Sequence, residues 1–252
     1  MSDNFKIIIL AIFDKYDFSN KAMADIHGKS MLQYVFESAK SSGANEIVIA
    51  TDNARVGMAA EDFGATVCML VGDNLKGISR LAEVADKMFW GDDTVIVNFP
   101  ADAPLIPGEV VAQVAVNLMS RADSDCATLY SLVTREFAEK EETINMVVDS
   151  VDNVMYLSHL PIPNIHSEGY ELSAYKCYLE VNAYRAGLLR VFRNLPESDL
   201  NQAEGIEELK LLHNGIAIHA DEACASIGQR VIKEENIAKI KFLIEPERQV
   251  SK

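Results

Sequence analysis

The segment Lys6-Ile7-Ile8-Ile9-Leu10-Ala11-Ile12 is the clearest indicator of the fold class of this chain. It is a continuous run of apolar and mostly β-branched residues, which is typical of a strand buried on both faces of a parallel sheet. Three later segments, at residues 46–51, 66–71 and 94–99, are also strand-like. Helical patterns separate the four segments, and this alternation predicts a parallel sheet with helices packed on both of its faces.

Helix signals lie between these strands. Ser30-Met31-Leu32-Gln33 has the form of a capping box, in which a serine side chain begins a helix. We expect a second helix capped by Asp52 or Asn53, a third within residues 77–90, and a fourth that starts at Pro107. The apolar stripe predicted for the first helix consists of Met31, Leu32, Val35, Phe36 and Ala39.

From Cys126 onward the pattern changes. Strand-like segments at residues 126–133, 145–149 and 154–158 come with little helix between the last two, so we expect an antiparallel excursion over about residues 125–180. The expected order ends with a strand at 178–182, a helix through Leu188 and Phe192, a helix from about 202 to 213, a strand at 216–219 and a last amphipathic helix.

Composition limits the function. The chain has 252 residues, 49% hydrophobic and 24% charged, which suits one large α/β domain or two small ones. A net charge of −15 argues against binding to nucleic acid or to an anionic membrane surface. We find neither a signal peptide nor an apolar run long enough to span a membrane. The four cysteines form no CxxC pair, so we expect buried, reduced thiols in a cytoplasmic protein.

In open α/β sheets, ligands bind beyond the carboxyl ends of the strands, which here means the loops at residues 13–21, 72–77 and 100–104. The first loop has no dinucleotide fingerprint, and the chain has no phosphate-binding P-loop motif. Asp102 is the best single candidate, because a carboxylate at this place can hold Mg²⁺ while the metal bridges phosphate oxygens. The alternative is that Asp102 only caps the turn into the helix that starts at Pro107.

Several segments together resemble one family, the 3-deoxy-manno-octulosonate (KDO) cytidylyltransferases, also called CMP-KDO synthetases. The resemblance runs from about residue 5 to residue 244. It implies a single domain over residues 1–252 with a three-layer α/β/α nucleotide-diphospho-sugar transferase fold, and a homodimer formed through the antiparallel excursion. The segments that carry it are residues 22–31, 49–52, 67–69, 77–83, 92–98 and 184–187.

The resemblance also implies a reaction. The anomeric hydroxyl of the sugar attacks the α-phosphate of CTP in the presence of Mg²⁺, and pyrophosphate leaves. The product feeds lipopolysaccharide synthesis in the cytoplasm of Gram-negative bacteria. Enzymes that act on the 8-amino form of the sugar belong to the same family, so either sugar acid is an expected substrate.

Site residues follow from the matching motifs. Lys21 resembles the loop lysine that contacts the triphosphate, and Asp102 resembles the magnesium aspartate; these two are the catalytic candidates. Arg80 resembles an arginine near the sugar site. Within the segments that match or replace family motifs, the further substrate-binding candidates are Lys15, Lys76 and Tyr184.

The chain departs from the family in its first loop, where two arginines are replaced by Ile12 and Asp17. Exchanging a positive for a negative charge about 5 Å from a phosphate shifts the interaction by roughly 6 kcal/mol before screening. The second metal aspartate falls at Ile232, although Glu234 or Glu235 could substitute after a local shift in alignment.

Three hypotheses therefore stay open. The first is an active sugar cytidylyltransferase. The second is a noncatalytic paralogue that binds a protein partner or a metabolite. The third is a transferase that has changed its nucleotide or its sugar.

Overall fold

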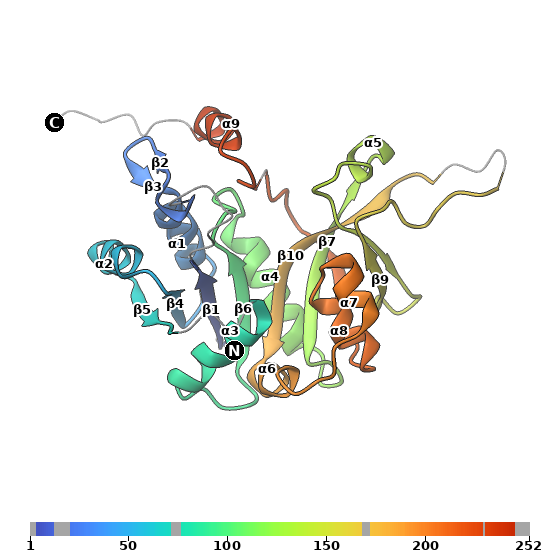
Figure 1. The fold of residues 1–252 in the computed structure, drawn as a ribbon, viewed down its shortest axis with the longest axis horizontal. Helices are drawn as coiled ribbons and strands as arrows, with labels where there is room; N and C mark the ends of the chain where they lie inside the picture. Colours follow the sequence, from blue (N-terminus) through green and yellow to red (C-terminus); the bar gives the residue numbers. More distant parts are fainter. Residues whose placement is uncertain (1–3, 13–20, 72–76, 168–171, 229, 245–252) are drawn as a thin grey trace.

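The computed structural model describes residues 4–12, 21–71, 77–167, 172–228 and 230–244. Within these residues the main sheet has nine strands, seven of them in the order β11-β7-β10-β6-β1-β4-β5 (Figure 1). The parallel part is formed by four neighbouring strands, as the sequence predicts. They are β1 (Phe5–Leu10), β4 (Glu46–Thr51), β5 (Thr66–Met69) and β6 (Val95–Pro100).

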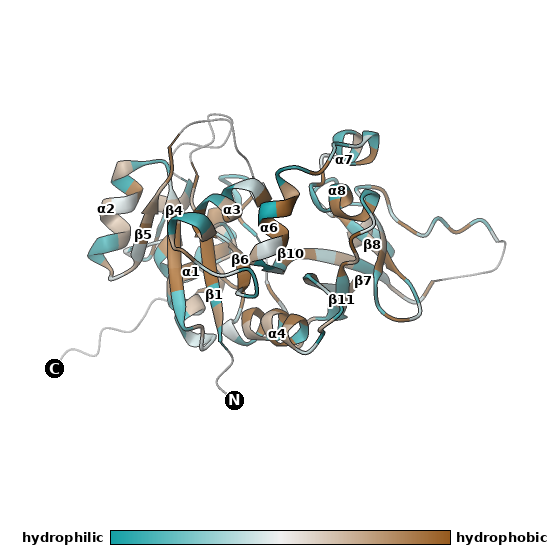
Figure 2. Ribbon diagram, turned by 90° about the horizontal axis from the view of Figure 1, so that it is seen from below, coloured by the Kyte–Doolittle hydropathy of each residue, from teal (hydrophilic) through white to brown (hydrophobic). Residues whose placement is uncertain are grey.

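Helices cover both faces of this sheet, which confirms the predicted fold class. Along β1, Ile7 and Ile9 point into the core on one face and Ile8 into the core on the other. Figure 2 shows β1 and β4 as largely hydrophobic strands between the helices. On the first face lie α1 (Met31–Ser41), α2 (Ala54–Asp62) and α4 (Gly108–Met119); on the second lie α3 (Gly77–Lys87), α6 (Ala186–Phe192) and α8 (Glu208–His213).

The antiparallel excursion is also confirmed. The long strand β10 (Tyr175–Arg185) runs antiparallel to β6, β7 and β8, and so joins the parallel part to the rest of the sheet. In Figure 1, β9 and α5 lie on the far side of β10 from β1 and β4. The other elements of this part are β7 (Cys126–Val133), α5 (Arg135–Ala138), β8 (Asn145–Val148) and β9 (Val154–Ser158). At the edge of the sheet, β11 (His219–Glu222) pairs parallel to β7.

The predicted start of the first helix is correct. The Ser30 hydroxyl accepts a hydrogen bond from the backbone N–H of Gln33 at 3.2 Å, and all five residues of the predicted stripe are buried. Asn53 caps the second helix by accepting hydrogen bonds from the backbone N–H groups of Arg55 and Val56. Short elements near these helices are η1 (Lys21–Met23), β2 (Asp25–Ile26) and β3 (Lys29–Ser30).

Two predictions about the C-terminal part are wrong. The helix expected over residues 202–213 is two helices, α7 (Asp199–Glu204) and α8, because Gly205 adopts a left-handed conformation with φ of 69° and ends α7. The strand expected at 216–219 begins only at His219. The last helix is α9 (Asn236–Leu243).

The burial of the cysteine thiols mostly agrees with the prediction from the sequence. Cys68, Cys126 and Cys177 are buried and free, whereas Cys224 is exposed, against expectation. No helix within the described ranges combines the length and the apolar character that crossing a membrane requires.

Candidate active site

A cavity of about 360 Å³ lies where β1 and β6 end. Its walls come from the carboxyl ends of these strands, the first residues of α3 and α8, and the middle of β10. Ligands of open α/β sheets bind at this edge. The polar side chains that line the cavity are Lys21, Asn98, Asp102, Tyr178, Glu180, Asn182, Glu207, Glu208 and Arg230.

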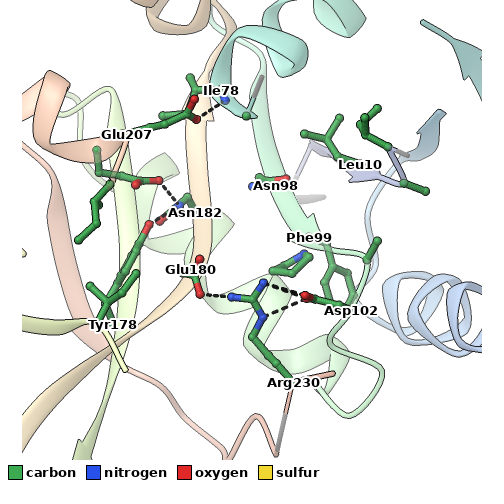
Figure 3. Close-up of a pocket in the computed structure, with 18 of the residues that line it drawn as sticks. Leu10, Ile78, Asn98, Phe99, Asp102, Tyr178, Glu180, Asn182, Glu207 and Arg230 are labelled. Carbon is green, nitrogen blue, oxygen red and sulfur yellow. Dashed lines mark hydrogen bonds and ion pairs between the residues drawn. The ribbon is translucent and has the colours of Figure 1, made fainter. Parts of the chain in front are cut away.

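One wall is a cluster of ion pairs around Asp102 (Figure 3). The Lys21 ammonium lies 3.0 Å from Asp102 Oδ2. The Arg230 guanidinium donates from Nε to Oδ1 at 3.0 Å and from Nη2 to Oδ2 at 3.1 Å, so both carboxylate oxygens are engaged. A further guanidinium nitrogen, Nη1, contacts Glu180. Arg230 therefore connects Asp102, beyond β6, to Glu180 on β10.

These cations determine the ionisation of Asp102. Burial alone would raise the pKa of its carboxyl group. The attraction of Arg230 and Lys21 is stronger, and it holds the pKa of Asp102 below the usual value. Asp102 is thus a stably ionised carboxylate within a cluster of compensating charges.

The opposite wall carries two neighbouring glutamates at the start of α8. Glu207 Oε2 accepts a hydrogen bond from the backbone N–H of Ile78 at 2.8 Å, which ties α8 to the start of α3. Glu208 Oε1 accepts from Asn182 Nδ2 at 2.9 Å and from the Tyr184 hydroxyl at 3.1 Å. Burial raises the pKa of both Glu207 and Glu208, although these hydrogen bonds oppose the shift. The turn at Gly205 positions this wall, because α7 ends there and α8 begins after it as a separate helix.

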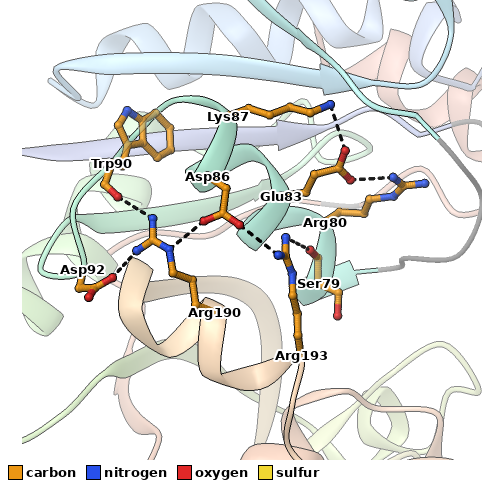
Figure 4. A network of polar contacts seen from close by, with 9 residues as sticks. All are labelled: Ser79, Arg80, Glu83, Asp86, Lys87, Trp90, Asp92, Arg190 and Arg193. Carbon is orange, nitrogen blue, oxygen red and sulfur yellow. Dashed lines mark hydrogen bonds and ion pairs between the residues drawn. The ribbon is translucent and has the colours of Figure 1, made fainter.

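Of the predicted site residues, the structure brings Lys21 and Asp102 together in the cavity. Tyr184 is fully buried, does not line the cavity, and donates a hydrogen bond to the lining residue Glu208. Arg80 is buried on α3, where its Nη1 donates to Glu83 at 2.9 Å, and it does not line the cavity (Figure 4). Lys15 and Lys76, two further candidates, lie outside the described residues.

Sequence reasoning missed most of the polar lining. Glu180 interrupts an otherwise apolar part of β10, and an acid in such a strand was an available signal. The sequence pattern predicts one continuous helix over residues 202–213, which hides the pair at residues 207–208. The residues missed are Asn98, Tyr178, Glu180, Asn182, Glu207, Glu208 and Arg230.

The residues around Asp102 do not fit a divalent cation. Magnesium requires close oxygen ligands, and here a guanidinium and an ammonium already surround the carboxylate. A doubly charged ion about 4 Å from one such cation would be repelled by roughly 8 kcal/mol at an effective dielectric of 20. Ile232 supplies no ligand, and Glu234 and Glu235 are exposed and do not line the cavity.

Over the described ranges, no group of three or more histidine, cysteine, aspartate or glutamate side chains is placed to hold a metal ion. Magnesium binding therefore stays a prediction from the sequence, and the ligands around Asp102 do not favour it.

Comparison with known proteins gives a consistent family. Residues 7–220 match the family model described as Cytidylyltransferase. A 3-deoxy-manno-octulosonate cytidylyltransferase of Coxiella burnetii (strain RSA 331 / Henzerling II) is 35% identical over 248 residues, covering 94% of this chain and 98% of the relative. The enzyme of the same name from Haemophilus influenzae (strain 86-028NP) is 34% identical, covering 96% and 98%.

A solved structure has the same fold over almost the whole chain. It is CMP:2-keto-3-deoxy-manno-octonic acid synthetase complexed with CTP, with a TM-score of 0.88 and 31% identity. The match covers 95% of this chain and 98% of that one.

Proposed function

The chain belongs to the cytidylyltransferase family, and from this premise we propose that it transfers CMP from CTP to a 3-deoxy-octulosonate or to its 8-amino form. In this reaction the anomeric hydroxyl of the sugar loses its proton to solvent, and its oxygen forms a bond to the α-phosphorus. The bond from that phosphorus to the oxygen bridging to the β-phosphate breaks, and pyrophosphate leaves. The relatives named for this activity match over nearly the full length, which supports the assignment.

The observation that carries the proposal is the position of Lys21 and Asp102 in one cavity beyond β1 and β6. A cationic side chain at this edge can exchange Asp102 for a bound triphosphate as its partner, because the triphosphate carries more negative charge. On the opposite wall, Asn182, Glu207 and Glu208 offer hydrogen-bond acceptors to the hydroxyl groups of a sugar. One wall therefore suits phosphate and the other suits the sugar.

Three wider features belong to the same proposal. We infer a homodimer, a cytoplasmic location and a role in lipopolysaccharide synthesis, because these accompany the reaction in the family that the sequence resembles. Size-exclusion chromatography with light scattering tests the first of them directly.

The reaction is tested by measuring pyrophosphate release from CTP with KDO and, separately, with its 8-amino form. Each mixture is run with magnesium and with a chelator. We expect release with at least one sugar acid. Absence of turnover with both sugars under both conditions would refute the proposal.

A second candidate function is a noncatalytic paralogue that binds a metabolite or a protein partner. The ion pairs of Arg230 across the cavity, together with Ile232, favour it. Thermal unfolding with CTP separates the two candidates, because a ligand at a hundredfold excess over its Kd stabilises the folded state by about 2.7 kcal/mol. An unchanged melting temperature together with absent turnover would favour the paralogue.

A further inference from the structure

Arg230 occupies the middle of the cavity wall, between two carboxylates that come from different parts of the sheet (Figure 3). Its guanidinium lies 2.9–3.1 Å from the oxygens of Asp102 and also contacts Glu180. Only 23% of its side chain is exposed. The arrangement resembles a cation held between two acidic ligands, except that the cation belongs to the chain.

The backbone fixes this side chain in place. The N–H of Val231 donates to the carbonyl oxygen of Asp102 at 2.8 Å, so the segment that carries Arg230 is bonded to the segment that carries its partner. Val231 is completely buried in a small core with Ile26 and Ile240. Arg230 therefore enters the cavity from an anchored position.

The backbone of Glu180 adopts an unfavourable conformation. It lies on β10 at the register shift between Tyr178 and Asn182, and its φ of 57° is in the left-handed region. This conformation is unfavourable for a residue other than glycine, asparagine or aspartate. The ion pair with Arg230 offsets part of that cost, so Glu180 and Arg230 form a matched pair.

From this geometry we propose that Arg230 takes the cation position at Asp102 and excludes a divalent metal ion from it. An arginine suits this role, because its guanidinium stays charged at every relevant pH and binds both oxygens of a carboxylate at once. Only one consequence of this inference rests on the proposed function. If the chain binds a nucleotide, that nucleotide would meet Arg230 and Lys21 at this wall in place of a metal ion.

The test is titration with Mn²⁺, followed by electron paramagnetic resonance, on the full chain without nucleotide. We expect Arg230→Ala to bind Mn²⁺ at least tenfold more tightly than the wild type, because Asp102 and Glu180 lose their shared cation. Adding Asp102→Asn to that variant should return the affinity to the wild-type level. Arg193→Gln is the matched control, since Arg193 is similarly exposed and pairs with Asp86 on α3 (Figure 4).

Two results would overturn the inference: one Mn²⁺ bound per wild-type chain and lost in Asp102→Asn, or no gain of affinity in Arg230→Ala. If circular dichroism shows that Arg230→Ala does not fold, Arg230→Gln replaces it with the same expectation. The Mn²⁺ titration contains no nucleotide, so its result does not depend on the result of the pyrophosphate assay. Each of the two proposals can therefore be refuted without the other.

Discussion

Replacing Asp102 with asparagine should destabilise the protein by about 3 kcal/mol at pH 7. The carboxylate is shared by Lys21 and Arg230, and the side chains of the three residues are only 15–23% exposed. Removing it leaves two partly buried cations without their common partner. Breaking a buried pair costs about 3–5 kcal/mol, and we take the lower end because some solvent reaches the cluster. For a chain of this size the loss lowers the melting temperature by about 6–12 °C.

The pH dependence of the free energy of unfolding provides a second, independent test of this prediction. Because the folded-state pKa of Asp102 lies below its unfolded value of about 3.9, its stabilisation is fully present above that value. It is lost as the pH falls through the folded-state pKa. The difference in the free energy of unfolding between wild type and Asp102→Asn should therefore shrink as the pH falls below about 3.9.

Urea unfolding followed by circular dichroism measures both effects. Asp93→Asn, in an exposed turn before β6, is the control and should change the free energy of unfolding by less than about 0.5 kcal/mol. An Asp102→Asn variant as stable as the wild type at pH 7, or a difference in the free energy of unfolding that does not change with pH, would contradict this prediction.

Burial raises the pKa of Glu208, so its contribution to stability should fall as the pH rises above the unfolded value of about 4.3. In urea titrations above that pH, Glu208→Gln should lose less stability than the wild type, which keeps both Glu207 and Glu208. Gly108→Ala would place a Cβ atom 2.2 Å from Ser41 Oγ, where α4 meets α1, and should lower the free energy of unfolding by about 1–3 kcal/mol. The control Gly91→Ala, whose Cβ would meet nothing within 4 Å, should lower it far less in the same thermal melts. Lys21→Gln should weaken CTP binding at least about tenfold by calorimetry, because a charge near a phosphate is worth roughly 3 kcal/mol.

The fold could be predicted from local patterns because each strand and helix of the parallel half carries its own signal. The run at residues 6–12 alternates between two cores, and Ser30 caps the helix that the apolar stripe predicts. The break at Gly205 was missed because apolar periodicity continues across it, and only the left-handed φ of the glycine separates the two helices. That error concealed the wall of the cavity that α8 forms.

The site was less accessible to sequence reasoning for a different reason. Lys21 and Asp102 follow strands that end at the same edge of the sheet, so topology alone places them near each other. Arg230 lies 128 residues beyond Asp102 and outside any strand or helix, and no local periodicity links the two. Arg80 is a different case, because its segment resembles the family, whereas its side chain pairs with Glu83 and is not among the residues that line the cavity.

The charge balance of the cavity constrains how an anionic ligand can bind. Among the described lining residues, four carboxylates face two cations, Lys21 and Arg230, and both cations already pair with Asp102. A triphosphate therefore gains most of its attraction by replacing Asp102 as their partner, and its affinity is the difference between two sets of ion pairs. The raised pKa values of Glu207 and Glu208 reduce the opposing charge, because each is more readily neutral than an exposed glutamate. The pairs with Asp102 thus hold the two cations in position when no ligand is bound, so that binding exchanges partners without first ordering the side chains.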